Sequence, residues 1–147
     1  MINFKEISIE NRTSEEVTCQ FFEHEEENIL LVKLAGVCSV GSSGENYGAY
    51  LYQKIGLALL TTQPNAVLVD LQELEYQFGD RISLLFQVFS QVRIFDEEEI
   101  ITAFVCSDKN KLGLASLLQF DLENPAPPFF YDLQLAYKTL YEQYDRI

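Results

Sequence analysis

Apolar residues occur in this chain in two alternating patterns, short continuous runs and longer stretches with helical spacing. A short run that is nearly all apolar is typical of a β-strand covered on both faces, as at 66–71 and 100–106. Apolar residues three and four positions apart indicate an amphipathic helix, as for Ile82, Leu85 and Phe89. Together the patterns predict strands at 17–22, 29–37, 66–71, 100–106 and 128–131, and helices at 45–62, 80–94, 109–120 and from Asp132 onward.

The connections between these elements restrict the topology. Strands 17–22 and 29–37 are joined by the short polar segment 23–28, so they must be antiparallel, because a parallel crossover needs about a dozen residues. After this hairpin, strands and helices alternate. We therefore expect an α/β fold with a mixed, mainly parallel sheet of about five strands flanked by helices. The length suits a single domain, 1–147, in which residues 1–16 form an N-terminal extension or a first strand.

The charge of the chain narrows the classes of partner. With 10 basic and 23 acidic residues, the formal net charge is −13. Such a chain is repelled by phosphate backbones and anionic lipids, so we expect no binding to nucleic acid or to a membrane surface. The acidity either steers the protein toward a basic partner or keeps it in solution. No apolar run approaches the ~20 residues that span a bilayer, and Met1–Glu6 lacks the layout of a signal peptide, so a cytoplasmic location is expected.

No familiar catalytic centre can be assembled from the sequence. His24 is the single histidine and lies among glutamates in the predicted hairpin turn, which indicates a surface residue and excludes histidine-based metal clusters. Residues 41–44, Gly-Ser-Ser-Gly, lack the rest of a P-loop or a nucleophile elbow and predict a strand-to-helix turn. We expect no catalytic residue, metal ion or cofactor. The cysteines are expected to be buried free thiols, at Cys19, Cys38 and Cys106.

Two further features have alternative interpretations. Asp70 ends the strand 66–71, where open α/β sheets place ligands, or it simply pairs with a neighbouring backbone amide. In the predicted last helix, Tyr137, Tyr141 and Tyr144 lie on more than one face, so some are expected to be exposed or packed on another chain. A homodimer is therefore left open.

Several segments follow the pattern of a known family: an early apolar strand ending in glycine, a central strand with an Asp-Leu pair, a further strand, and a closing strand and helix. These segments are Ile29–Gly36, Ala66–Tyr76, Ile101–Ser107 and Phe129–Ala136. In them, from about residue 28 to 143, the chain resembles STAS domains, the anti-sigma factor antagonist modules that also form cytoplasmic tails of sulfate transporters. The resemblance implies the STAS fold.

The chain departs from this family at the phosphorylation motif. STAS domains carry an acidic-Ser-Ser/Thr-Gly motif before their second main helix, and a partner kinase phosphorylates its first hydroxyl. Counted from the end of strand 66–71, the motif falls on 78–81, which reads Phe-Gly-Asp-Arg. Gly79 takes the position of the phosphorylated serine, so the usual switch is not expected. Asp80 either caps the following helix or imitates a phosphorylated residue through its charge.

The leading hypothesis is a non-catalytic STAS-like regulatory module that acts by binding another protein, either a basic protein or a regulatory kinase-like one. The expected contact surface is the loop 76–81 with the helix that follows. The candidate partner-binding residues are Tyr76, Phe78, Gly79, Asp80, Arg81 and Ser83.

Three alternatives remain open. The chain is a small-molecule or lipid binder with an apolar cavity near this loop, lined by Phe78, Phe86 and Phe89. It is an acidic inhibitor of a basic enzyme. It is an enzyme of unfamiliar type that would use the charged side chains of Asp70, Asp80 and Arg81.

Overall fold

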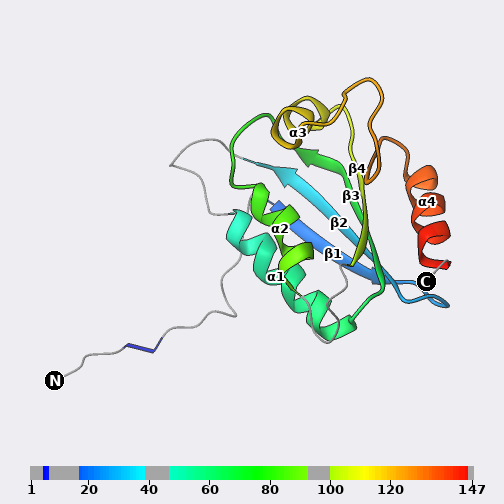
Figure 1. Ribbon diagram of the computed structural model, residues 1–147. Coiled ribbons are helices and arrows are strands. Elements are labelled where there is room, and N and C mark those ends of the chain that lie inside the picture. The colour runs from blue at the N-terminus through cyan, green and yellow to red at the C-terminus, as the bar shows by residue number, and fades with distance from the viewer. Residues whose placement is uncertain (1–4, 7–16, 39–46, 93–99, 146–147) are drawn as a thin grey trace.

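The computed structural model describes residues 5–6, 17–38, 47–92 and 100–145. Strands and helices follow the predicted order within these ranges, with an opening hairpin and then alternating helices and strands (Figure 1). The elements are β1 (Val17–Glu23), β2 (Ile29–Val37), α1 (Tyr47–Thr62), β3 (Ala66–Glu75), α2 (Ser83–Gln91), β4 (Ile101–Val105), α3 (Lys111–Leu118), β5 (Phe129–Phe130) and α4 (Leu133–Asp145). Predictions for residues 41–44 and for most of 1–16 lie outside the described residues.

The five strands form one mixed sheet in the order β1-β2-β3-β4-β5. β1 pairs with β2 antiparallel, while β2, β3, β4 and β5 are parallel to one another. The predicted fold class is therefore confirmed. β1 lies at one edge of the sheet, and its short connection to β2 accounts for their antiparallel pairing.

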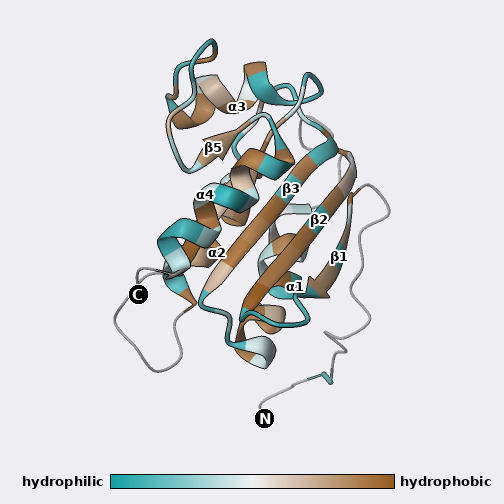
Figure 2. Cartoon of the chain, turned by 90° about the vertical axis from the view of Figure 1, so that its right-hand side faces the viewer, coloured by the Kyte–Doolittle hydropathy of each residue, from teal (hydrophilic) through white to brown (hydrophobic). Residues whose placement is uncertain are grey.

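Helices cover the two faces of the sheet unequally. α1 and α2 pack side by side on one face, and the larger cluster of buried residues lies between them and the sheet (Figure 1). α4 lies on the other face, over β3, β4 and β5, above a smaller cluster that includes Leu68, Ala103 and Leu140 (Figure 2). α3 lies at the end of the sheet where the parallel strands finish.

The tyrosines of α4 pack within this chain. Tyr137, Tyr141 and Tyr144 are half-buried against the smaller cluster, and their rings follow one another with centroids 6.2 and 6.5 Å apart. Within this chain, the three rings therefore pack on their own helix and on the smaller cluster beneath it. Asp132 opens the helix as predicted, since its carboxylate accepts the Leu135 N–H at 2.8 Å.

Several predicted boundaries differ from the observed ones by a few residues. α2 begins at Ser83 rather than at residue 80, and β3 continues to Glu75 instead of ending near 71. The cysteines are free as expected, with Cys38 and Cys106 buried and Cys19 half-buried. Among the described residues, no helix combines the length and the hydrophobicity that crossing a bilayer requires.

Candidate functional site

The candidate site is the loop of residues 76–82, which connects β3 to α2. It lies at the carboxyl end of the parallel strands, the edge where open α/β sheets place their binding sites. Five of the six predicted site residues belong to this loop, and the sixth, Ser83, is the first residue of α2. The structure therefore brings the predicted residues together in one short segment.

Tyr76 anchors the loop from its buried side. Its side chain is only 3% exposed, and its hydroxyl donates a hydrogen bond to the carbonyl oxygen of Gly79. Its backbone N–H donates to the Lys109 carbonyl oxygen at 3.1 Å, which ties the start of the loop to the segment before α3. Burial raises the pKa of the Tyr76 phenol, and the nearby Cys38 and Asp80 add to the shift. Tyr76 thus shapes the loop and presents almost no surface to a partner.

Two glycines on neighbouring helices allow the loop to pack closely. A Cβ at Gly113 of α3 would lie 2.8 Å from the Tyr76 ring and would also collide with the Gln77 carbonyl oxygen. A Cβ at Gly48 of α1 would collide with the Arg81 carbonyl oxygen. Since real Cβ atoms do not come this close to a main-chain oxygen, both positions require glycine. The loop is therefore held between α1 and α3.

The outer side of the loop exposes an aromatic ring. Phe78 is 60% exposed, and Gly79 and Asp80 beside it are also exposed. Gly79 has φ +115°, a conformation that side chains disfavour, although a Cβ there would meet no atom within 4 Å. A serine at this position would therefore be strained by the backbone alone. The backbone conformation of the loop therefore favours glycine at position 79.

Asp80 does not cap the helix with its side chain. The N-cap residue of α2 is Ile82, which makes no side-chain capping bond, and it is the backbone carbonyl of Asp80 that accepts the Ser83 N–H at 3.0 Å. The Ser83 hydroxyl donates to the same carbonyl oxygen at 2.6 Å. The predicted cap is wrong because a tight turn precedes the helix, so the helix begins three residues after Asp80.

A buried asparagine that the sequence analysis missed supports the strand before the loop. β4 ends at Val105, so among the described residues no strand lies beside the part of β3 beyond Asp70 on that side. Asn110 is 1% exposed and donates from Nδ2 to the carbonyl oxygens of Leu71 and Leu74, at 2.6 and 2.8 Å. Its Oδ1 accepts the backbone N–H of Ser107 at 3.0 Å. One side chain thus replaces the missing strand, and β3 continues to Glu75.

Asp70 pairs with a neighbouring backbone amide, which is one of the two roles predicted for it. It is 6% exposed, and its carboxylate accepts the Gln72 N–H at 3.0 Å. At this point the pairing with β2 shifts register, from Lys33 opposite Asp70 to Ala35 opposite Glu73. Asp70 therefore stabilises an irregularity in β3 through a neighbouring amide.

A groove of about 570 Å³ runs beside the loop, between the end of β3 and the start of α3. Glu75, Gln77, Lys109 and Leu112 are among its lining residues, and Leu112 is 68% exposed. Lys109 is bound to Glu73 outside the groove, with Nζ and Oε2 2.9 Å apart. The groove therefore adjoins the start of the loop, through Tyr76 and Gln77.

The three phenylalanines proposed to line a cavity do not lie together in one. The Phe86 and Phe89 rings pack against Phe104, with centroids 4.9 and 5.7 Å away, as part of the main core. Phe78 instead faces outward. Within the part of the chain that the structure describes, no group of three metal-ligating side chains is gathered in one place.

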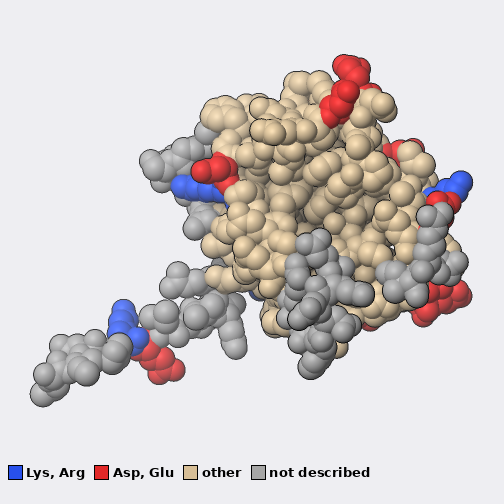
Figure 3. Space-filling model, in the orientation of Figure 1, with Lys and Arg blue, Asp and Glu red and all other residues tan. Residues whose placement is uncertain are grey.

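Charge is unevenly distributed over the molecule. α2 contains no charged residue, and α1 contains one, Lys54. Figure 3, in the orientation in which α1 and α2 face the viewer, shows few Lys, Arg, Asp or Glu side chains among the described residues at the centre of this face. The described acidic residues include a group in the β1–β2 hairpin, Glu23, Glu25, Glu26 and Glu27.

Comparison with known proteins identifies the fold. No protein-family model matches the sequence, and no curated protein matches it. A solved structure, an anti-sigma factor antagonist from Mycobacterium paratuberculosis, is similar with a TM-score of 0.61 over 85% of this chain and 94% of that one. This chain has a STAS-like fold. The two sequences are 17% identical, so the likeness concerns the STAS-like architecture.

Proposed function

We propose that this STAS-like protein is a non-catalytic regulatory module that acts by binding a protein partner through loop 76–82 and α2. The observation that carries the proposal is the exposed Phe78 on a loop held between two helices. A large aromatic side chain on a rigid support is the usual centre of a protein interface, because little conformational freedom is lost on binding. The similar anti-sigma factor antagonist supports a regulatory role.

The exposed face of α2, which carries no charged residue, indicates how the partner binds. Gln87, Ser90 and Gln91 are the exposed residues of α2, and each can exchange hydrogen bonds without carrying charge. Contacts on this face therefore rest on apolar burial and neutral hydrogen bonds. This arrangement favours a regulatory partner, such as a kinase-like protein, over a basic enzyme that would be attracted by the net charge of −13.

The glycine at position 79 also affects whether binding can be regulated by phosphorylation. Because position 79 has no hydroxyl and a backbone conformation that favours glycine, binding here is not switched by phosphorylation of this residue. The module is instead always competent to bind. Control of the interaction then rests with the amount or the state of the partner.

Affinity capture from a lysate of the source organism tests the proposal. We would compare the wild type with Phe78→Ser and with a matched control, Phe22→Ser, because Phe22 is 47% exposed on the edge strand β1. We expect the same partner with wild type and control, and at least about a tenfold loss with Phe78→Ser, as for a residue at an interface centre. Circular dichroism would verify that the variants fold.

The salt dependence of capture distinguishes the proposed regulatory partner from a basic enzyme. Binding through the uncharged face should persist at about 0.5 M salt, whereas attraction to a basic enzyme should be largely screened there. Equal capture by Phe78→Ser and by Phe22→Ser would show that the contact surface lies elsewhere.

A small-molecule binder is the second candidate, and the groove beside the loop favours it. Its volume of about 570 Å³ lies within the usual range of roughly 300–1,000 Å³ for ligand sites. In a thermal-shift screen of metabolites, a ligand of this groove should raise the melting temperature of wild type and not that of Leu112→Arg, which blocks the groove from an exposed position.

A further inference from the structure

Among the described residues, no strand pairs with the first half of β4 on its outer side. The backbone N–H groups of Phe104 and Cys106 donate to the carbonyl oxygens of Pro128 and Phe130, both at 2.8 Å. The backbone N–H and carbonyl groups of even-numbered residues in this strand therefore point toward β5. The backbone N–H and carbonyl of Thr102 point to the same side, because backbone groups alternate in direction along a strand. The described pairing between β4 and β5 begins only at Phe104.

Prolines prevent the chain's own β5 segment from extending this pairing. Pro127 and Pro128 precede β5 and have no backbone N–H to donate, so they cannot continue the ladder toward the Thr102 carbonyl. On the other side, the N–H of Ile101 donates to the carbonyl oxygen of Asn65 at 3.4 Å. The backbone groups of odd-numbered residues therefore point toward β3. Within the described residues, no strand pairs with Thr102 on the β5 side.

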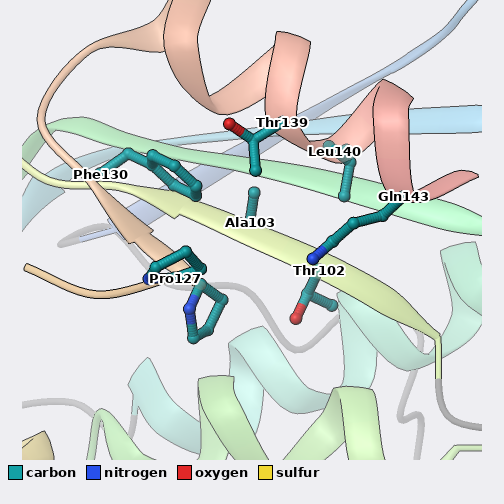
Figure 4. A pocket seen from close by; sticks show the side chains of 8 residues that line it. Thr102, Ala103, Pro127, Phe130, Thr139, Leu140 and Gln143 are labelled. Carbon is teal, nitrogen blue, oxygen red and sulfur yellow. The ribbon is translucent and has the colours of Figure 1, made fainter.

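A small hollow occupies the place where a neighbouring strand would run. It has a volume of about 180 Å³ and lies between β4 and α4, and Figure 4 shows Gln143 extending from α4 toward Thr102. None of its lining residues is charged, and they include Thr102, Ala103, Pro127, Pro128, Thr139 and Gln143. The volume corresponds to about six water molecules and is smaller than the roughly 300 Å³ of the smallest usual ligand pockets.

We propose that this edge binds a short, uncharged, extended peptide segment as an added strand beside Thr102. The backbone N–H and carbonyl of Thr102 match the donor and acceptor of a peptide group, which is the basis of strand addition. The side-chain amide of Gln143, which extends toward Thr102, provides a neutral polar contact beside it (Figure 4). This site is separate from loop 76–82, so its test is independent of the proposed function.

A blocked peptide, acetyl-Ala-Thr-Ala-N-methylamide, is the probe, titrated into ¹⁵N-labelled protein. Shifts should centre on Thr102, with millimolar affinity, and amide exchange of Thr102 should slow while that of Ala103, which faces β3, stays unchanged. Gln143→Trp, which fills the mouth, should weaken binding at least about tenfold. Gln134→Trp is the matched control, since Gln134 is exposed on the same helix and does not line the hollow.

Three results would overturn the proposal. Slow exchange of the Thr102 amide in the free protein would mean that this N–H already has a partner. Equal binding by Gln143→Trp and Gln134→Trp would place the peptide outside the hollow. Equal protection of Thr102 by N-methylacetamide at the same concentration would show a site for one amide group and not for a strand.

Discussion

Two turns at opposite ends of the sheet are held in place by different means. The hairpin turn 23–28 joins β1 to β2, carries four glutamates, and is fixed largely by its own residues. The loop 76–82 follows β3, exposes Phe78, and is fixed by α1, by α3 and by the segment that precedes α3. Local bonds are sufficient for a solvated turn, whereas an exposed apolar side chain is kept in one position only by contacts from several parts of the fold.

The hairpin depends on its histidine. His24 Nδ1 accepts the backbone N–H groups of Glu26 and Glu27, at 3.1 and 3.0 Å, so it carries no proton. Nε2 therefore carries the proton and donates to the Tyr137 hydroxyl of α4, 3.2 Å away. The predicted surface position of His24 is confirmed, yet the side chain also organises the turn.

The largest expected effect in this comparison comes from removing the buried asparagine behind the loop. Asn110→Ala leaves the carbonyls of Leu71 and Leu74 without partners, so we expect a loss of about 3 kcal/mol in the free energy of unfolding. The matched change at the hairpin is Asn28→Ala, which removes one exposed bond to the Gln63 carbonyl and should cost less than about 1 kcal/mol. Urea unfolding measures both. Equal losses would show that the two turns are supported equally.

The next effect concerns the glycine contact between α1 and the loop. Gly48→Ala forces a Cβ against the Arg81 carbonyl, and we expect a loss of about 2 kcal/mol from overpacking. In the same helix, Gly56→Ala meets its nearest side chains, Val88 and Val92, at 3.6 Å, an ordinary contact. That variant should gain about 0.5–1 kcal/mol because alanine favours helix. A gain for both variants, measured by urea unfolding, would mean that α1 does not hold the loop.

A smaller effect, dependent on pH, is expected at the anchor of the loop. Tyr76→Phe removes the bond to the Gly79 carbonyl and should cost about 1 kcal/mol at neutral pH. The pKa of Tyr76 is raised in the folded protein from the ordinary value of 10.0, mainly by burial. Its contribution to stability is therefore present below pH 10 and is lost as pH rises further.

Unfolding measured at pH values from about 9 to about 11 tests this sign. The wild type should lose more stability over this range than Tyr76→Phe, which has no phenol to ionise. A Tyr137→Phe variant is the control, because Tyr137 is only half-buried and binds the hairpin. If wild type and Tyr76→Phe lose stability in parallel, the phenol is not held by the loop.

The features that the sequence predicted are those that depend on neighbouring residues. The short segment 23–28 required an antiparallel pair, and Asp132 stood where a helix would begin, as its bond to Leu135 confirms. The position of the candidate loop followed from counting along the STAS pattern to residues 78–81. Each of these inferences spans only a few residues along the chain.

What could not be predicted depends on contacts between distant segments. Asn110 binds carbonyls 36 and 39 residues earlier, so nothing local showed that β3 would continue to Glu75. The close approach of Gly48 and Gly113 to the loop is likewise visible only in three dimensions. Asp80 has the residue type of a cap, but the turn before α2 placed Ile82 there instead. The candidate loop could be proposed from the sequence, whereas the contacts that support it could not.

The smallest effect is expected at the hairpin, and it sharpens the contrast between local and distant support. His24→Ala removes the acceptor for two amides and the contact with Tyr137, and should cost about 1 kcal/mol. His24→Asn keeps an acceptor oxygen where Nδ1 lies, as in turns that asparagine forms by itself, and should recover at least half of that loss. Urea unfolding of both variants, with Tyr137→Phe alongside, divides the loss between its two sources. If His24→Asn is no more stable than His24→Ala and Tyr137→Phe loses as much, the hairpin is held mainly by α4, and the distinction between the two turns fails.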